Sequence, residues 1–238
     1  MRKIYAVGVG PGSPKYVTEI VKEVIQNCDI VIGYKYTLKT IEDLLVGKEI
    51  YEITMNNQEE TYQKIFLELD ERSLVIPFTG DVNFSESEVV DRLIEIFGNV
   101  DIITGISSIQ VAASKARVPL DKSKIITMHI TSSIEEKKLE LQKALIDGYS
   151  VILIPRPWPK QPDKHFMPSE IAFYLKNNGF KIENIKVHVF EALTTKDETN
   201  FVGTVKDLEG KQFSDLSIMV FNQSVLDSYM NYKWQWKN

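Results

Sequence analysis

The first fourteen residues place the strongest constraint on the fold of this chain. Residues 4–7 are apolar or β-favouring and run directly into Gly8-Val9-Gly10-Pro11-Gly12-Ser13-Pro14. A short apolar run that stops at clustered glycines and prolines predicts a buried strand ending in a tight loop. Apolar residues then recur at helical spacing over 20–25, so the loop joins a strand to a helix. Open α/β sheets bind ligands at this end of their strands, and glycines let the backbone approach a ligand closely.

The spacing of these glycines argues against a dinucleotide site. The dinucleotide-binding pattern is G-x-G-x-x-G and opens directly into a helix whose free N–H groups hold a pyrophosphate. Here the spacing is G-x-G-P-G, and Pro11 and Pro14 remove two N–H donors from the loop. Such a loop suits an apolar or cationic small molecule better than a phosphate. A tight turn that binds nothing is the alternative interpretation of this loop taken alone.

Composition narrows the class of protein. The chain has 238 residues, of which 43% are hydrophobic, and a formal net charge of −5. That length allows two medium domains or one large domain, and the charge argues against nucleic acid as a partner, because nucleic-acid-binding surfaces are usually basic. The single cysteine, Cys28, excludes an internal disulfide, and we expect it to be a small core residue. The three histidines are scattered, so we expect no metal site. No apolar run approaches ~20 residues, so we expect no membrane partner. No signal-peptide pattern is present, and we expect a cytoplasmic protein.

The order of apolar segments predicts an α/β fold with two domains. Strands alternate with helices in the first half, which predicts a mostly parallel sheet covered on both faces. Expected strands after the first lie over 28–33, 49–53, 73–78 and 100–103, and expected helices over 34–45, 61–71, 86–97 and 109–116. Proline and charge over 117–121 indicate a junction, so we predict domains over 1–118 and 119–238.

The second half has fewer helices per strand, which predicts a mixed sheet. We expect a hairpin over 199–208. Expected strands lie over 125–130, 149–154, 185–190 and 217–221, and expected helices over 134–146 and 169–176, the former capped by Ser132 or Ser133.

Three strands of the first half end in small, turn-forming residues. The loops are Gly8–Ser13, Thr79–Asp81 and Gly105–Ser108. If the sheet is parallel, all three loops lie at the same edge, and their convergence is a stronger signal than any one of them. Taken singly, Gly80-Asp81 is also compatible with a plain turn and Ser107-Ser108 with a helix N-cap.

These residues together resemble a known family. The first loop, Gly80-Asp81 after a strand, and Gly105-Ile106-Ser107-Ser108-Ile109-Gln110 are similar to the tetrapyrrole (corrin/porphyrin) methylases, and the resemblance covers nearly the whole chain. Within that family, Thr127-Met128-His129 and Glu191-Ala192-Leu193-Thr194 resemble the branch that methylates cobalt-precorrin-7 at C5. The chain departs from the family at Val82, where proline is usual, and from the branch at Ile130, where glycine is usual, and residues 155–168 are longer and richer in proline than expected.

The resemblance implies a fold, a cofactor and a set of contacts. It implies two α/β domains with a cofactor cleft between them, S-adenosyl-L-methionine as the methyl donor, and a homodimer. The cofactor supplies the methyl group on a sulfonium, so the protein would mainly align the reactants and exclude water. The implied cofactor contacts are Gly10, Pro11, Gly80, Asp81, Phe84, Ser107, Ser108, Ile154 and Ala192.

Substrate and proton transfer involve other residues. The implied substrate is an anionic corrinoid that carries several carboxylates, and a basic run directly after a strand suits carboxylates. That run consists of Arg156, Lys160, Lys164 and His165, of which the first three are our candidates, with a solvated loop as the alternative. His129 is a candidate for accepting a proton after methylation, although a histidine at a strand end is more often structural.

Other functions remain open on the sequence. One alternative is a sister methylase that acts at another ring carbon, or the related diphthine synthase, which methylates a protein. The second is a non-catalytic cofactor-binding protein of the same fold, which the altered Gly80-Asp81-Val82 loop keeps open.

Overall fold

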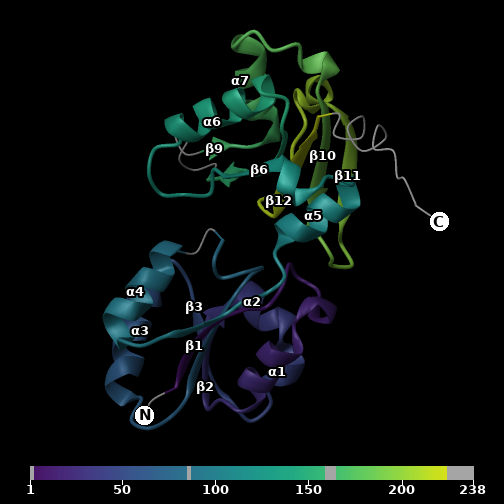
Figure 1. The fold of residues 1–238 in the computed structure, drawn as a ribbon. Coiled ribbons are helices and arrows are strands. Elements are labelled where there is room, and N and C mark those ends of the chain that lie inside the picture. Colours follow the sequence, from purple (N-terminus) through teal and green to yellow (C-terminus); the bar gives the residue numbers. More distant parts are fainter. Residues whose placement is uncertain (1–2, 85–86, 159–164, 224–238) are drawn as a thin grey trace, which may run out of the picture. The chain divides into compact units, whose positions relative to one another are not determined.

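The computed structural model describes residues 3–84, 87–158 and 165–223, and these form two units (Figure 1). The first unit spans residues 1–108 and the second 109–238. The sequence predicts a boundary at 118, whereas the structure assigns α5 (Ser108–Ala116) almost entirely to the second unit. The reason is that the carboxyl-terminal end of α5 bonds within that unit: Lys115 pairs with Glu198, and the Ala116 carbonyl accepts from Asn222 Nδ2 at 3.4 Å.

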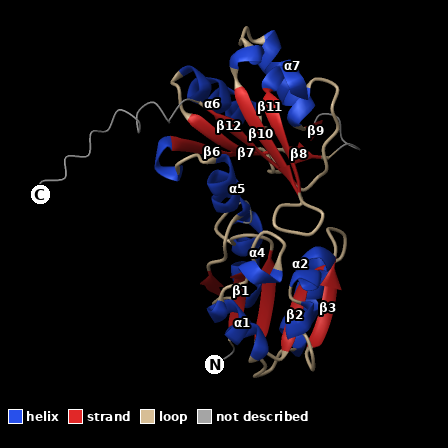
Figure 2. Cartoon of the chain, turned by 90° about the vertical axis from the view of Figure 1, so that its right-hand side faces the viewer, coloured by secondary structure: helices blue, strands red, loops and turns tan. Residues whose placement is uncertain are grey.

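The first unit contains a five-stranded sheet in which every pair of neighbouring strands is parallel (Figure 2). The spatial order is β3-β2-β4-β1-β5. The strands are β1 (Ile4–Gly8), β2 (Ile30–Tyr34), β3 (Glu49–Ile53), β4 (Leu74–Phe78) and β5 (Asp101–Ile103). The predicted α/β class with a mostly parallel first sheet is therefore confirmed. The three strands that lead into the glycine-containing loops, β4, β1 and β5, are neighbours.

Helices cover both faces of this sheet. On one face, α1 (Glu19–Gln26) and α2 (Lys35–Thr40) bury Val21 and Leu38 in one core cluster. On the other, α3 (Gln58–Glu68) and α4 (Ser87–Phe97) bury a cluster that includes Tyr62 and Leu93. The predicted helix over 34–45 is shorter than expected: Ile41 leaves the helical region, with φ −117°, while its side chain packs in the core.

Short 3-10 turns connect several of these elements. They are η1 (Pro14–Tyr16), η2 (Glu42–Leu44), η3 (Leu120–Lys122), η5 (Ile182–Asn184) and η6 (Val205–Leu208).

Cys28 is a core residue, as the sequence predicts. Its side chain is 4% exposed and its Sγ donates to the Ile25 carbonyl at 3.1 Å. Burial raises the pKa of this thiol to about 11, so it stays protonated at neutral pH. Across the described part of the chain, no group of His, Cys, Asp and Glu side chains has the arrangement of a metal site. Among the helices that the structure describes, none is long and apolar enough to cross a membrane.

The second unit contains a mixed five-stranded sheet, as predicted, in the order β11-β10-β12-β7-β6. Its strands are β6 (Ser123–Thr127), β7 (Ser150–Ile154), β10 (Lys186–Glu191), β11 (Thr199–Thr204) and β12 (Ser217–Asn222). Strands β6 and β7 are parallel, and the remaining pairs are antiparallel. A separate ribbon joins β8 (Arg156–Pro157) to β9 (His165–Phe166). The predicted hairpin over 199–208 is wrong, because β11 pairs with β10 and the chain then turns into η6.

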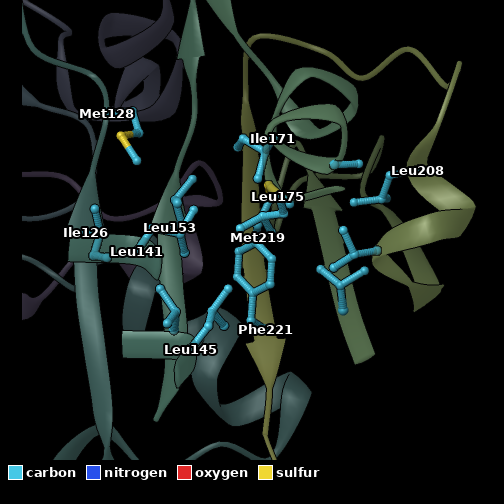
Figure 3. Packing of buried hydrophobic residues seen from close by; sticks show 14 of the residues in the cluster. Ile126, Met128, Leu141, Leu145, Leu153, Ile171, Leu175, Leu208, Met219 and Phe221 are labelled. Atoms are coloured by element: carbon cyan, nitrogen blue, oxygen red, sulfur yellow. The ribbon is translucent and has the colours of Figure 1, made fainter. Parts of the chain in front are cut away.

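One face of this sheet carries the core of the second unit (Figure 3). Helices α6 (Glu135–Ile146) and α7 (Pro168–Asn177) bring Leu141 and Leu175 onto strand residues that alternate in and out of the sheet. Leu153, Met219 and Phe221 are fully buried there. Burying each such side chain stabilises the fold by about 1.5–3 kcal/mol compared with leaving it in water. This packing holds in place the strands whose ends carry the candidate residues described below.

Candidate functional site

The first and second loops of the first unit bond to each other through glycine backbone. Gly80 N–H donates to the Gly10 carbonyl at 2.8 Å, and Gly10 N–H donates to the Gly80 carbonyl at 3.2 Å. Both residues lie in the left-handed region, with φ of +80° at Gly10 and +74° at Gly80, which a side chain would strain. The two loops are therefore held together by residues whose backbone conformation favours glycine.

The third loop joins them through an even closer approach. A Cβ placed on Gly105 would lie 2.3 Å from the Gly80 carbonyl oxygen and 2.4 Å from that of Gly8. A Cβ on Gly8 would lie 2.5 Å from the same Gly80 oxygen. These distances are too short for any real side chain, so the three backbones touch. The convergence of three loops at one sheet edge, expected from the sequence, is present within the first unit.

Asp81 ties two of these loops with its side chain. Its Oδ2 accepts from Gly105 N–H at 2.9 Å, and its Oδ1 accepts from Asn83 N–H at 2.8 Å. A plain turn at Gly80-Asp81 does not account for the bond to the third loop. Both carboxylate oxygens already bind backbone, so Asp81 shapes the site, and direct contact with a cofactor stays a prediction.

The other predicted contacts of the first unit line the same edge. Gly10, Pro11 and Ser107 are buried, whereas Phe84 and Ser108 are half-buried. Phe84 N–H donates to the Asp81 carbonyl at 3.2 Å, and α5 begins at Ser108. The structure thus brings all seven predicted first-unit residues to the ends of three adjacent strands.

In the second unit, four further predicted residues gather at one edge of the mixed sheet. They are His129 after β6, Ile154 and Arg156 at the end of β7 and just beyond it, and Ala192 after β10. Thr127 pairs with Ile154 in the strand register, and Met128 N–H donates to the Ile154 carbonyl at 2.8 Å, which places the first two segments side by side.

Arg156 is buried, which rules out the solvated-loop alternative for this residue. Its side chain is 2% exposed, and its guanidinium donates to the carbonyls of Ser132 at 3.0 Å and Thr131 at 3.3 Å. The Nε atom is buried and has no hydrogen-bond partner among the described residues. The guanidinium also lies 5.1 Å from the centre of the Trp158 ring. Arg156 therefore fixes the loop after His129, and one of its donors is unused.

His129 stands at right angles to the same tryptophan. The two ring centres are 5.1 Å apart with an interplanar angle of 87°. Desolvation by neighbouring protein and, second, the charge of Arg156 lower the pKa of His129, while Asp215 opposes them. The imidazole is therefore neutral at pH 7, the form that can accept a proton.

The basic run is split by the structure. Lys160 and Lys164 lie outside the described residues. His165 belongs to β9, and its Nε2 lies 3.6 Å from Glu170. Of the predicted substrate residues, Arg156 alone can be placed.

Two carboxylates flank the turn after β10, and the sequence does not reveal the hydrogen bonds that they form. Ala192 and Thr194 have φ of 46° and 71°, unusual values for residues other than glycine. Glu191 accepts from Ser214 N–H at 2.6 Å and from the Thr199 hydroxyl at 2.9 Å, and Glu198 accepts from Thr194 N–H at 2.7 Å. Their spacing around a turn is visible in the sequence, but their partners are not.

A cavity of about 510 Å³ lies elsewhere in the second unit, at the carboxyl-terminal ends of α6 and α7. Lys186 and Asn222, which line it, stand at the opposite ends of β10 and β12 from Ala192 and Ser217. None of the predicted site residues lines this cavity.

The sequence of this chain is similar to a known family and to individual members of it. The family model of the Tetrapyrrole (Corrin/Porphyrin) Methylases matches residues 3–209. A probable cobalt-precorrin-7 C(5)-methyltransferase of Methanocaldococcus jannaschii is 29% identical over 231 residues, covering 92% of this chain and 97% of the relative. A cobalt-precorrin-4 C(11)-methyltransferase of the same organism is 31% identical over 228 residues, covering 88% and 82%.

Solved structures share the fold. The methyltransferase CobJ has a TM-score of 0.77 at 16% identity, covering 94% of this chain and 95% of that chain. The precorrin-6Y methylase of Archaeoglobus fulgidus has a TM-score of 0.66 at 19% identity, covering 94% and 98%.

Proposed function

We propose, because this chain belongs to the tetrapyrrole (corrin/porphyrin) methylases, that it transfers a methyl group from S-adenosyl-L-methionine to C5 of cobalt-precorrin-7 in cobalamin biosynthesis. The chain is a methyltransferase of corrinoids by family and homology. The observation that carries the proposal is the family match over 3–209, which contains all three glycine loops and the turn after β10.

The choice of ring carbon rests on coverage. The relative named for C5 aligns over more of both chains than the relative named for C11, and Thr127-Met128-His129 and Glu191–Thr194 resemble the C5 branch. Methylation at C11 or another carbon is the main alternative. Val82, which departs from the family pattern, and Ile130, which departs from the pattern of the C5 branch, favour testing that alternative by experiment.

The residues of the first unit fit a sulfonium cofactor. A Cβ on Gly80 would meet nothing closer than 3.8 Å, so the backbone there can approach a ligand, and the neighbouring Asp81 carboxylate is directed to amides of its own unit. A strongly anionic lining would stabilise the cationic sulfur of the ground state, which loses its charge during transfer, and would slow the reaction. Loops of backbone and Pro11 avoid that penalty. When bound, the cofactor supplies the methyl group.

The residues of the second unit would handle the substrate. Arg156 would donate a hydrogen bond to a substrate carboxylate from its Nε–H, which has no partner among the described residues. Alternatively, it would hold the loop at Ser132 in the position that binds this carboxylate. His129, neutral at pH 7, would accept the proton that the ring loses after methylation.

Binding and turnover test this proposal together. Calorimetric titration should show binding of S-adenosylmethionine and S-adenosylhomocysteine, and incubation with labelled cofactor and cobalt-precorrin-7 should give a product with the label at C5 by NMR. His129→Gln should slow methylation without changing cofactor affinity, and the wild-type rate should fall as the pH drops through the lowered pKa of His129.

Each failure has a distinct meaning. Label at another carbon supports the sister methylase, and label in a protein acceptor supports the diphthine synthase. Cofactor binding without transfer to any candidate leaves a non-catalytic protein, and absence of binding refutes the proposal.

A cytoplasmic homodimer is part of the same proposal, and the family resemblance supports it. Light scattering at micromolar concentrations should then give about twice the chain mass of 27.3 kDa. A mass equal to that of one chain over the whole range would contradict the dimer.

A further inference from the structure

The turn over residues 191–198 holds two residues in an unfavourable backbone conformation. Ala192 and Thr194 lie in the left-handed region with φ of 46° and 71°. Residues other than glycine seldom adopt it, because their Cβ crowds the backbone. Such strain persists only where the surroundings enforce it, and it gathers at ligand-binding and catalytic sites.

Hydrogen bonds within the turn account for Ala192. Its N–H donates to the Leu216 carbonyl at 3.2 Å, which anchors the turn beside β12. Its carbonyl accepts from Thr195 N–H at 3.1 Å and from the Thr195 hydroxyl at 2.7 Å. Both backbone groups of Ala192 are therefore bound within the protein, and its position depends on the residues that follow it.

Thr194 is held by a side chain, that of Glu198. Thr194 N–H donates to Glu198 Oε2 at 2.7 Å, a charge-assisted hydrogen bond across the mouth of the turn. The other oxygen, Oε1, pairs with Lys115 Nζ. Burial alone would raise the pKa of Glu198, but Lys115 and the Thr194 amide outweigh it and the net pKa is lowered, so the carboxylate is charged at neutral pH.

Lys115 connects the Glu198 carboxylate to α5, the helix that follows the third glycine loop. Lys115 lies near the end of α5, and α5 begins at Ser108, the last residue of the third glycine loop. Glu198 is only 21% exposed, so solvent screens the pair less than it screens fully exposed ion pairs. One carboxylate thus bonds both the strained turn and the helix that continues from a cofactor loop.

We propose that Glu198 is a positioning residue for the adenosyl cofactor: by holding Thr194 N–H, it keeps the turn around Ala192 in its binding conformation before the cofactor arrives. The inference rests on the proposed function, in which Ala192 contacts the cofactor. A turn that is already ordered in the free protein loses little conformational entropy when the cofactor binds. Affinity for the cofactor therefore falls when the turn becomes disordered.

Calorimetric titration of the intact protein with S-adenosylhomocysteine tests this inference. Glu198→Ala should raise the dissociation constant about tenfold or more, since a charge-assisted hydrogen bond of this kind corresponds to at least a decade in affinity. Glu198→Gln keeps an oxygen for Thr194 N–H and should stay within about threefold of wild type. Lys115→Ala removes the ion pair, leaves the hydrogen bond and should behave like Glu198→Gln.

A matched control separates this effect from the loss of a partly exposed ion pair. Glu209 pairs with Lys176 at 2.7 Å in the same unit; Glu209 directly follows η6 and Lys176 lies on α7, so neither belongs to the turn. Glu209→Ala should leave the dissociation constant unchanged. Should Glu198→Ala fail to give a cooperative melting transition, Glu198→Met, which keeps the side-chain volume without an oxygen, takes its place with the same expected loss.

The outcomes separate the two proposals. Wild-type protein that binds no S-adenosylhomocysteine overturns the proposed function and this inference with it. Wild-type protein that binds, together with an oxygen-free variant at 198 that binds equally well, overturns this inference alone. A Glu198→Gln variant as weak as Glu198→Ala also overturns it, because the hydrogen bond to Thr194 would then not be the cause.

Discussion

Replacing Gly105 with alanine is expected to separate the three loops of the first unit and to weaken cofactor binding about tenfold or more, because each ~1.4 kcal/mol needed to restore the loop geometry lowers the affinity by a decade. The added methyl would lie 2.3 Å from the Gly80 carbonyl oxygen and 2.4 Å from that of Gly8. Neither oxygen can rotate away, because both belong to backbone at the end of a sheet. Relief requires movement of the loops, which costs about 1–3 kcal/mol or more in folding free energy.

Thermal melting and titration with S-adenosylhomocysteine measure the two effects of Gly105→Ala. Gly98→Ala is the matched control in the same unit: Gly98 has φ of +83°, and a Cβ there would meet no atom within 4 Å. That variant should lose about 1 kcal/mol from left-handed strain and bind the cofactor normally. A Gly105→Ala protein with wild-type affinity would show that the contact among the three glycines does not shape the site.

Replacing Arg156 with alanine is expected to destabilise the second unit by about 2–3 kcal/mol, because two charge-assisted hydrogen bonds and a cation–π contact are lost. Ser132 and Thr131 would lose the donor that holds their carbonyls, and the Trp158 ring would lose its charged neighbour. Removing the desolvated charge offsets part of this loss. If the guanidinium or its loop receives a substrate carboxylate, the apparent substrate constant should also rise about tenfold, the effect of one such bond.

Melting temperature, substrate constant and cofactor affinity should be measured on the same Arg156 variants. Arg156→Lys keeps the charge but cannot bridge two carbonyls with a planar fork, so its stability should lie between wild type and alanine. Lys176→Ala, which removes an exposed ion pair of the same unit, should change stability by about 0–1 kcal/mol. An Arg156→Ala variant with normal stability and substrate constant but weaker cofactor binding would assign the residue to the other ligand.

The edge where the loops meet was predictable, because it follows from local patterns. Each of the loops Gly8–Ser13, Thr79–Asp81 and Gly105–Ser108 stops a short apolar strand, and a parallel sheet sends all such ends the same way. The strand order β4-β1-β5, which makes the loops neighbours, depends on pairing between distant segments and has no local signal. The hydrogen bond from Gly105 N–H to Asp81 spans 24 residues for the same reason.

Long-range contacts also decide the features that the sequence leaves open or predicts wrongly. A basic run looks alike whether its first member is solvated or buried, and only the carbonyls of Thr131 and Ser132 explain why Arg156 turns inward. The predicted hairpin over 199–208 failed because β10 offers β11 a longer partner than the segment could offer itself. Glu198 belongs to the pattern that resembles the C5 branch, but its role depends on a turn whose dihedral angles the sequence does not reveal.

The buried sulfur of Cys28 makes this chain suitable for site-selective chemical labelling. The thiol is 4% exposed and protonated at neutral pH, so maleimides and disulfide reagents should leave the folded native protein unmodified. A cysteine introduced at an exposed position such as Leu67, on the outer side of α3, would then be the reactive thiol of the folded chain. A fluorophore could be attached there without removal of the natural cysteine.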